Sequence, residues 1–217
     1  HFFESLLPKI THYVKSDYKE TWLAVKDKRI EKHNLYLKKI PFCDFKVFDS
    51  ILKSIPDHSI LQVGNSSAIR YTQLFSLNKT LEVYCNRGTS GIDGSTSTAV
   101  GFSAVSKKRT VFITGDLSFL YDSNGLWNNY IPKNFRIIVI NNQGGGIFRI
   151  LPGQKNTENF DTFFETKHNL NAKYLSKMYG FEYTSATTEK QIKNKLEVFY
   201  NASEGPKLLE IFTPRTI

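Results

Sequence analysis

Cysteine is nearly absent from the sequence, which contains only Cys43 and Cys85 among its 217 residues. Their spacing is not that of metal ligands, and a chain of this length can build an apolar core without a disulfide. We therefore expect two reduced thiols in a cytoplasmic protein. Long hydrophobic stretches are also missing, because runs such as Ile137–Ile140 are strand-sized. A membrane helix needs about 20 apolar residues, so no membrane span is predicted.

Nucleotide-binding fingerprints are missing as well: the sequence has neither a P-loop nor a G-x-G-x-x-G motif, which argues against a nucleoside triphosphatase or a dinucleotide enzyme. The net charge of +9 could suggest a nucleic-acid partner. The positive charge is densest at Lys26–Lys39, where Asp27 and Glu31 interrupt it, as is typical of a solvated helix face. No basic motif interleaved with aromatic residues occurs, so no nucleic-acid partner is expected.

The residues that are present predict a globular protein, since 40% are hydrophobic and 14% aromatic. Leu23, Ile30 and Leu37 recur every seven residues, which predicts a helix over 16–39 that Pro41 closes. A second amphipathic helix is expected over 45–55. The chain starts at His1 without an initiator Met and has no signal-peptide pattern, so we expect it to be cut from something longer. The main domain is expected over 41–217, with 1–40 belonging to a preceding domain or linker.

From residue 60 onward, short apolar runs alternate with helical patterns. The predicted strands are 60–63, 81–84, 111–113, 137–140, 181–183 and 208–212, and the predicted helices are 68–75, 95–106, 118–130, 172–179 and 189–200. This alternation predicts an α/β fold, with a doubly wound, mostly parallel six-stranded sheet and helices on both faces. The segment 144–170 has weak periodicity, and a loop of that length is usually functional or mobile.

Small polar turns follow four of these strands: Gly64-Asn65-Ser66, Asn86–Gly94, Gly115–Ser118 and Asn141–Gly146. In an open parallel sheet, ligands bind outside the carboxyl ends of the strands. Because the free N–H groups of helix N-termini favour anions, the four turns indicate a phosphate-bearing ligand.

Two pairs of side chains add chemistry to these turns. Asp116 and Asn142 end successive strands, and carboxylate and amide oxygens suit Mg²⁺. Asp116 could instead cap the helix that follows it. Arg70 and Arg87 flank the predicted pocket mouth, where guanidinium groups suit substrate carboxylates, although a surface arginine can also be merely solvated.

These motifs carry a family resemblance. Gly115-Asp116 followed by Asn141-Asn142 resembles the diphosphate-and-magnesium motif of thiamine-diphosphate (ThDP) enzymes, with Leu117 where many members have Gly. Three segments resemble more specifically the 2-succinyl-5-enolpyruvyl-6-hydroxy-3-cyclohexene-1-carboxylate (SEPHCHC) synthases of menaquinone biosynthesis, the MenD family: Gly64–Arg70, Asn86–Gly94 and Asn141–Leu151.

The resemblance implies roles for individual residues. Residues 41–217 would form the diphosphate-binding (PP) domain of the ThDP-binding fold, after the tail of a central domain in 1–40. Mg²⁺ or Mn²⁺ would be held by Asp116, Asn142 and the Gly144 carbonyl. ThDP would be bound by Asn65, Ser66, Gly91, Ile92, Gly115, Asp116, Leu117, Ser118 and Asn142, with Ile92 as the wedge that keeps the cofactor bent. Substrates would be bound by Arg70, Arg87, Ile147, Phe148 and Leu151.

The resemblance also implies an activity, a ThDP-dependent transferase that decarboxylates 2-oxoglutarate and adds the succinyl carbanion to isochorismate. No catalytic residue is expected in this chain. The activating glutamate would lie in a pyrimidine-binding (PYR) domain of a neighbouring subunit, in a homodimer or homotetramer, and Glu4, Glu20 and Glu31 are not candidates for that role. This chain alone would therefore be inactive.

Two alternatives stay open. The first is another ThDP-dependent 2-oxo-acid decarboxylase or carboligase. Arg70 and the Asn86–Gly94 loop favour the MenD family over this alternative. The second is a non-catalytic module whose basic face at Lys26–Lys39 binds an acidic partner. Salt-sensitive binding with no response to ThDP and Mg²⁺ would favour the second.

Overall fold

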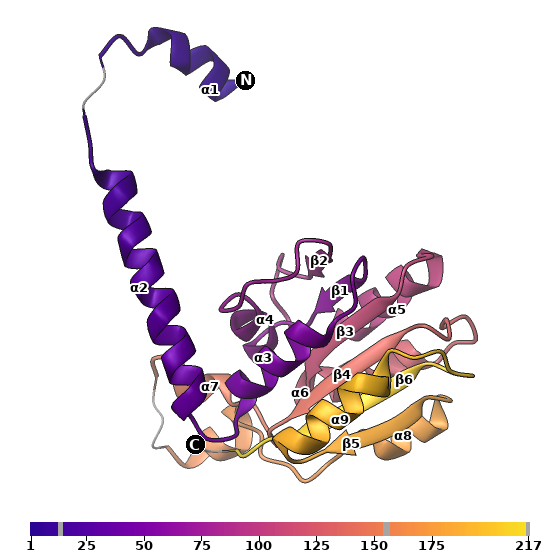
Figure 1. Cartoon of the computed structure of the whole chain (residues 1–217). Helices are drawn as coiled ribbons and strands as arrows, with labels where there is room; N and C mark the ends of the chain where they lie inside the picture. Colours follow the sequence, from indigo (N-terminus) through magenta and orange to yellow (C-terminus); the bar gives the residue numbers. More distant parts are fainter. Residues whose placement is uncertain (13–14, 154–156, 216–217) are drawn as a thin grey trace. The chain divides into compact units, whose positions relative to one another are not determined.

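The computed structural model describes residues 1–12, 15–153 and 157–215, and it divides the chain into two compact units, His1–Ile40 and Pro41–Ile217 (Figure 1). The first unit is helical and consists of α1 (Phe2–Leu6), a 3₁₀ turn (Leu7–Lys9) and α2 (Tyr18–Lys39). Helix α2 ends before Pro41 because a residue that precedes proline avoids helical backbone, and Ile40 is extended. No helix in the described residues is long and apolar enough to cross a bilayer.

The second unit contains a six-stranded sheet in which every pair of neighbouring strands is parallel. The strands are β1 (Ile60–Val63), β2 (Glu82–Cys85), β3 (Thr110–Gly115), β4 (Arg136–Asn141), β5 (Glu182–Ala186) and β6 (Lys207–Phe212), in the order β2-β1-β3-β4-β6-β5. The predicted doubly wound α/β fold is therefore confirmed.

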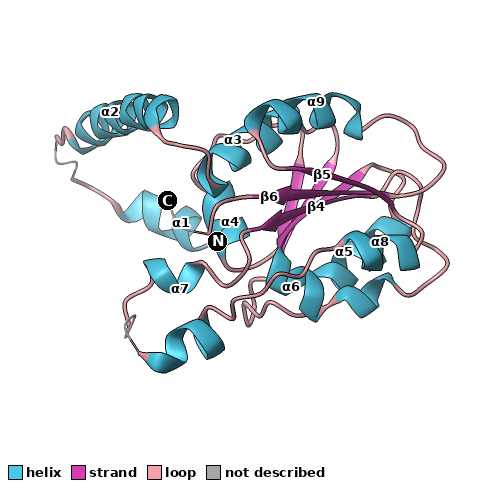
Figure 2. Cartoon of the chain, turned by 90° about the horizontal axis from the view of Figure 1, so that it is seen from below, coloured by secondary structure: helices cyan, strands magenta, loops and turns pink. Residues whose placement is uncertain are grey.

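Helices cover both faces of this sheet (Figure 2). One face carries α3 (Asp44–Ser54), α4 (Ser67–Thr72) and α9 (Glu189–Phe199), and the other carries α5 (Ser95–Val105), α6 (Asp116–Tyr121) and α8 (Lys173–Met178). The central strands are buried on both sides because their apolar residues alternate between the two cores: Ile138 packs with the first set of helices and Ile137 with the second.

The strand order places a switch point between β1 and β3. The chain leaves β1 toward β2, whereas it leaves β3 toward β4 on the other side. Turns that leave adjacent strands in opposite directions open a crevice at the carboxyl edge, which is where ligands bind in such sheets. The turns after β1, β3 and β4 meet at this place.

The helix predicted over 118–130 is wrong in both its limits. Helix α6 starts at Asp116 and ends at Tyr121, a 3₁₀ turn covers Ser123–Leu126, and 127–130 are not helical. The break comes from tertiary contacts: the Asp122 carboxylate accepts hydrogen bonds from the backbone N–H and the hydroxyl of Ser97, in the first turn of α5. Gly125 also lies so close to Ser97 that a Cβ would be 2.9 Å from its Cα.

Smaller differences occur elsewhere. The helix predicted over 68–75 is α4, which ends at Thr72, and the predicted strand ends differ from the observed ones by up to three residues. The segment 144–170 contains helix α7 (Ile147–Ile150) and a π-helical turn (Phe160–Phe164). Residues 154–156 of that segment lie outside the described residues.

Candidate cofactor site

A cavity of about 250 Å³ opens at the switch point. It lies where the turns after β1, β3 and β4 converge, together with the start of α3 and helix α7. The residues that line it are Asp44, Phe48, Asn65, Ser66, Ser67, Ala68, Ile92, Gly115, Asp116, Leu117, Ser118, Ile140, Asn142, Gly144, Gly145, Gly146, Ile147 and Phe148. The cavity is thus lined both by oxygen-bearing polar side chains and by apolar side chains.

Asp116 provides a carboxylate in this cavity and is 4% exposed. It is the first residue of α6, so it does not cap a helix that starts at Ser118. Its Oδ1 accepts the N–H of Leu117 at 2.7 Å, and its Oδ2 accepts the N–H of Gly144 at 3.0 Å. The carboxylate therefore joins the turn after β3 to the turn after β4.

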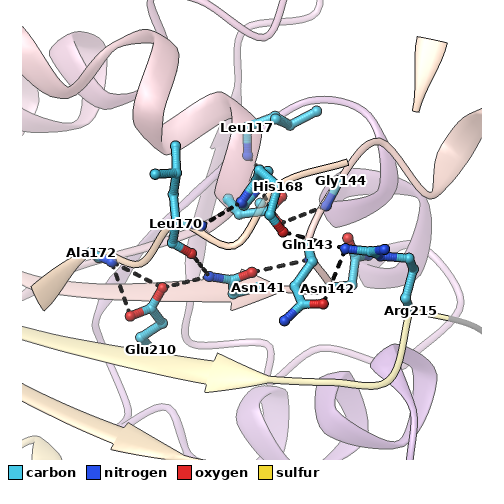
Figure 3. A network of polar contacts seen from close by, with 12 residues as sticks. Leu117, Asn141, Asn142, Gln143, Gly144, His168, Leu170, Ala172, Glu210 and Arg215 are labelled. Atoms are coloured by element: carbon cyan, nitrogen blue, oxygen red, sulfur yellow. Dashed lines mark hydrogen bonds and ion pairs between the residues drawn. The ribbon is translucent and has the colours of Figure 1, made fainter. Parts of the chain in front are cut away.

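His168 lies against the same carboxylate. Its Nε2 is 3.1 Å from Oδ2 of Asp116, and its Nδ1 accepts the N–H of Leu170 at 3.1 Å (Figure 3). Because Nδ1 is an acceptor there, the ring hydrogen is on Nε2. Nε2 lies within ion-pair distance of Asp116 but forms no hydrogen bond within the described residues. Oδ2 of Asp116 thus accepts the N–H of Gly144 and lies beside His168, while Oδ1 accepts only the N–H of Leu117 among the described residues.

Asn142 lines the same cavity as Asp116. Its Nδ2 donates to Oδ2 of Asp44 at 2.8 Å. Asp44 opens α3, is 8% exposed, and also accepts the hydroxyl of Thr213. Burial raises the pKa of Asp44, the hydrogen bonds from Thr213 and Asn142 oppose the shift, and the nearby Asp116 adds to it.

The turn after β4 is shaped by Gln143 and Gly144. Gln143 has a φ of 64° and Gly144 a φ of 151°, a region where a side chain is strained. The N–H of Gly145 donates to the Glu165 carbonyl at 2.6 Å, which ties the turn to the π-helical segment. The Gly144 carbonyl accepts the N–H of Gly146 at 3.1 Å, so one of its two lone pairs is left for a ligand.

A buried network holds this turn from behind. Glu210, in β6, accepts hydrogen bonds from Asn141 at 2.7 Å and from the backbone N–H of Ala172 at 3.0 Å (Figure 3). It also accepts the hydroxyl of Tyr183 at 2.7 Å. Burial and the hydrogen bond to Glu210 raise the pKa of Tyr183. The Oδ1 of Asn141 in turn accepts the N–H of Gln143 at 3.1 Å. This fixes the start of the Asn142–Gly146 turn.

Asn65 organises the loop between β2 and α5 with its whole side chain. Its Nδ2 donates to the carbonyls of Asn86 and Gly91, both at 2.7 Å, and its Oδ1 accepts from Arg87 at 3.0 Å. Ser118 also donates to this loop, at the Ile92 carbonyl. These contacts place Ile92 in the cavity wall, while Gly91 lies outside the lining set.

The predicted substrate residues are divided by the structure. Ile147 and Phe148 line the cavity, but Leu151, Arg70 and Arg87 do not. Leu151 is 37% exposed. Both arginines are exposed. Nη1 of Arg70 donates a hydrogen bond to the Ser66 carbonyl at 2.9 Å, on the turn that lines the cavity.

Sequence reasoning missed Asp44, His168 and Glu210. Glu210 carried a signal, because it is a charged residue inside the apolar run 208–212 of a strand predicted to be buried on both faces. Asp44 lies between Cys43 and Phe45, where an acid at a helix start looks ordinary. His168 lies in a segment without periodicity, so no pattern placed it.

Comparison with known families decides what this site belongs to. Residues 62–211 match the family described as thiamine pyrophosphate enzyme, C-terminal TPP binding domain. The chain belongs to this family. Its cofactor is therefore ThDP (thiamine pyrophosphate) with a divalent metal.

Curated relatives agree with this assignment. The chain is 56% identical over 216 residues to a 2-succinyl-5-enolpyruvyl-6-hydroxy-3-cyclohexene-1-carboxylate synthase from Flavobacterium psychrophilum, and 58% identical over 193 residues to one from Christiangramia forsetii. These alignments cover 100% and 89% of this chain but only 39% and 33% of the relatives. The chain thus spans well under half the length of the curated relatives it matches.

A solved structure matches the fold. Benzoylformate decarboxylase from Polynucleobacter necessarius superposes with a TM-score of 0.64 at 16% identity, over 83% of this chain and 34% of that one. At this identity the match supports the fold alone.

The cavity fits the TPP-binding family. In the described part of the chain, no three His, Cys, Asp or Glu side chains are placed to hold a metal together. One carboxylate with an amide and a carbonyl oxygen is a set suited to Mg²⁺ whose other ligands come from a phosphate group and water. The apolar part of the lining, with Ile92, Leu117 and Phe148, suits an organic ring.

Proposed function

We propose that this chain is the C-terminal, cofactor-binding part of a SEPHCHC synthase. The enzyme would decarboxylate 2-oxoglutarate and add the remaining four-carbon unit to isochorismate, in menaquinone biosynthesis. The observation that carries the proposal is the cavity at the switch point. Asp116 and Asn142 line this cavity together with Ser66, whose carbonyl accepts a hydrogen bond from Arg70. The curated relatives, which are SEPHCHC synthases, support the same reaction.

The metal would be held by Asp116, by Oδ1 of Asn142 and by the Gly144 carbonyl, with Mg²⁺ or Mn²⁺ as the ion. The cofactor, when bound, supplies the electron sink for loss of CO₂. Asn65 and Ser118 would act through the loop that they hold, since their side-chain hydrogen bonds go to that loop. Ser66, Gly115 and Leu117, from the turns after β1 and β3, would complete the cofactor contacts.

Both proposed substrates carry carboxylates, which exposed arginine side chains could bind. We assign Arg70 and Arg87 to these carboxylates because a guanidinium group forms strong, directional bonds to them. Ile147 and Phe148 would keep water away from the reacting carboxylate, with Leu151 at the outer edge of that wall.

The domain assignment belongs to the same proposal. Residues 41–217 would be the PP domain and 1–40 the tail of a central domain. A PYR domain outside these residues, from a neighbouring subunit of a homodimer or homotetramer, would supply the activating glutamate. The cytoplasm is proposed as the location because both cysteines are free.

An assay of donor choice tests the proposal. The full-length protein, with ThDP, Mg²⁺ and isochorismate, is given 2-oxoglutarate or pyruvate, and the products are identified by mass spectrometry. We expect a product from 2-oxoglutarate only, and none after chelation of the metal. Turnover of pyruvate without use of 2-oxoglutarate would instead indicate a different ThDP-dependent decarboxylase or carboligase.

A further inference from the structure

Asp44 is a buried carboxylate in the cavity wall. An acid in the first turn of a helix interacts favourably with the helix dipole even when it is exposed, so that interaction alone does not require burial. Burial is costly for a carboxylate that has no cation beside it. In the described residues Asp44 forms no ion pair, and its hydrogen bonds come from Thr213 and Asn142.

The hydrogen bond to Asn142 fixes an orientation. An amide nitrogen can only donate, and an ionised carboxylate can only accept. Because Nδ2 of Asn142 donates to Asp44 at 2.8 Å, the amide cannot flip without turning its oxygen toward a carboxylate. Oδ1 of Asn142 is thereby left on the other side, where it accepts no hydrogen bond from any described residue.

Asp44 is itself anchored to the sheet. Its Oδ1 accepts the hydroxyl of Thr213, and the N–H of Thr213 donates to the Asn141 carbonyl at 3.1 Å, one residue beyond the β4–β6 pairing. The orientation of Asn142 is thus set by residues that lie 98 and 71 positions away in the sequence. Asn142 directly follows β4 and Thr213 directly follows β6, so the contacts through Asp44 begin and end at two neighbouring strands.

We propose that Asp44 is a positioning residue, which holds the Asn142 amide so that Oδ1 faces the metal. This proposal rests on the proposed function, because it takes Asn142 as a metal ligand. Residues that orient a metal ligand typically change metal affinity about 10- to 100-fold when they are replaced. We expect an effect of that size for Asp44, although the residue does not touch the metal.

The test is a metal titration of the full-length protein at saturating ThDP. Mn²⁺ serves as the probe, with free ion counted by electron paramagnetic resonance, so the readout does not depend on activity. The variants are Asp44→Ala, which removes the acceptor, and Asp44→Asn, which keeps an acceptor oxygen for Asn142. Asp49→Ala is the matched control, since it is an acid on the same helix that pairs with Lys53.

We expect Asp44→Ala to weaken Mn²⁺ binding about 10- to 100-fold, with Asp44→Asn much closer to the wild type and Asp49→Ala unchanged. Thermal unfolding without metal is measured in parallel. Loss of stability without loss of Mn²⁺ affinity would show a purely structural role, and equal loss in both Asp44 variants would show a role of charge rather than orientation. Either result overturns the proposal.

Two further variants complete the test. Thr213→Val leaves the carboxylate but removes its anchor, and we expect an intermediate loss of affinity. It also keeps the proposal testable if Asp44→Ala does not fold, because unchanged affinity in Thr213→Val would then overturn it. Asn142→Ala separates the two proposals: if it leaves Mn²⁺ binding unchanged, the metal site itself is misassigned.

Discussion

The two oxygens of Asp116 have different partners. Oδ2 accepts the N–H of Gly144 and lies beside His168, whereas Oδ1 accepts only the N–H of Leu117 within the part of the chain that the structure describes. A carboxylate with one oxygen held by protein donors presents the other in a fixed direction, which is what a metal ligand requires. The metal-site assignment thus depends on a side chain that the protein itself orients.

We predict that Asp116→Ala abolishes Mg²⁺-dependent ThDP binding in the full-length protein. The reason is that this carboxylate is the charged member of the three proposed metal ligands, since Asn142 and the Gly144 carbonyl contribute neutral oxygens. Calorimetry with and without Mg²⁺ measures the loss, and circular dichroism checks that the variant is folded. If the variant binds ThDP with the Mg²⁺ dependence of the wild type, the assignment of Asp116 is wrong.

For Arg70→Ala, the prediction is a KM for the substrates that rises about 10- to 100-fold with little change in ThDP affinity, since a charge-assisted hydrogen bond contributes roughly 1.5–3 kcal/mol. Arg87→Ala should raise KM similarly. It should also weaken ThDP binding slightly, because Arg87 donates to Asn65, which holds the loop of Ile92.

Steady-state kinetics and ThDP titration measure the two effects of these arginine variants separately. Lys107→Ala is the control, an exposed cation near the amino end of β3, at the opposite edge of the sheet from the cavity. Equal loss of ThDP affinity and substrate KM in Arg70→Ala would place this arginine on the diphosphate instead.

At the scale of elements, the sequence predicts those helices, strands and turns whose residue pattern is local. Apolar runs such as Ile137–Ile140 are long and continuous enough to identify a buried parallel strand, and turns at the ends of four strands locate the site. The limits of α6 could not be predicted, because they depend on the hydrogen bonds between Asp122 and Ser97, 25 residues apart. The roles of Asp44 and His168 depend on distant partners in the same way.

The turn after β4 and the π-helical segment form one unit at this scale. At Gly144, a Cβ would lie 2.7 Å from the Glu165 carbonyl oxygen, and the φ of 151° is unfavourable for any side chain. Gly144→Ala is therefore predicted to destabilise the protein by about 1–3 kcal/mol and to weaken Mg²⁺ binding, since its N–H contacts Asp116.

Gly101→Ala provides the matched control for Gly144→Ala. Gly101 lies in α5, where a Cβ would meet nothing within 4 Å, so alanine should raise stability by up to about 1 kcal/mol through its helix propensity. Thermal unfolding and Mg²⁺ titration are measured for both variants. A Gly144→Ala protein with wild-type metal affinity would show that the turn does not need its close contact with Glu165.

At the scale of the whole molecule, residues 41–217 contain both apolar cores and every strand of the described sheet. A core on each face of a six-stranded sheet exceeds what an independently folding domain requires. The cavity is also lined entirely by this unit. Folding and assembly of a working site can therefore be separated by experiment.

We predict that residues 41–217, produced alone, unfold in one cooperative transition yet do not catalyse the addition of 2-oxoglutarate to isochorismate. The unit holds the proposed metal site, but the activating glutamate is assigned to a PYR domain, and ThDP would bind weakly because the part of the pocket assigned to that domain is missing. Thermal unfolding, ThDP calorimetry and the carboligation assay give the three readouts. Adding the remaining part of the protein in trans should restore some activity. Turnover by the isolated unit near that of the full-length protein would mean that a residue among 41–217 performs the activation.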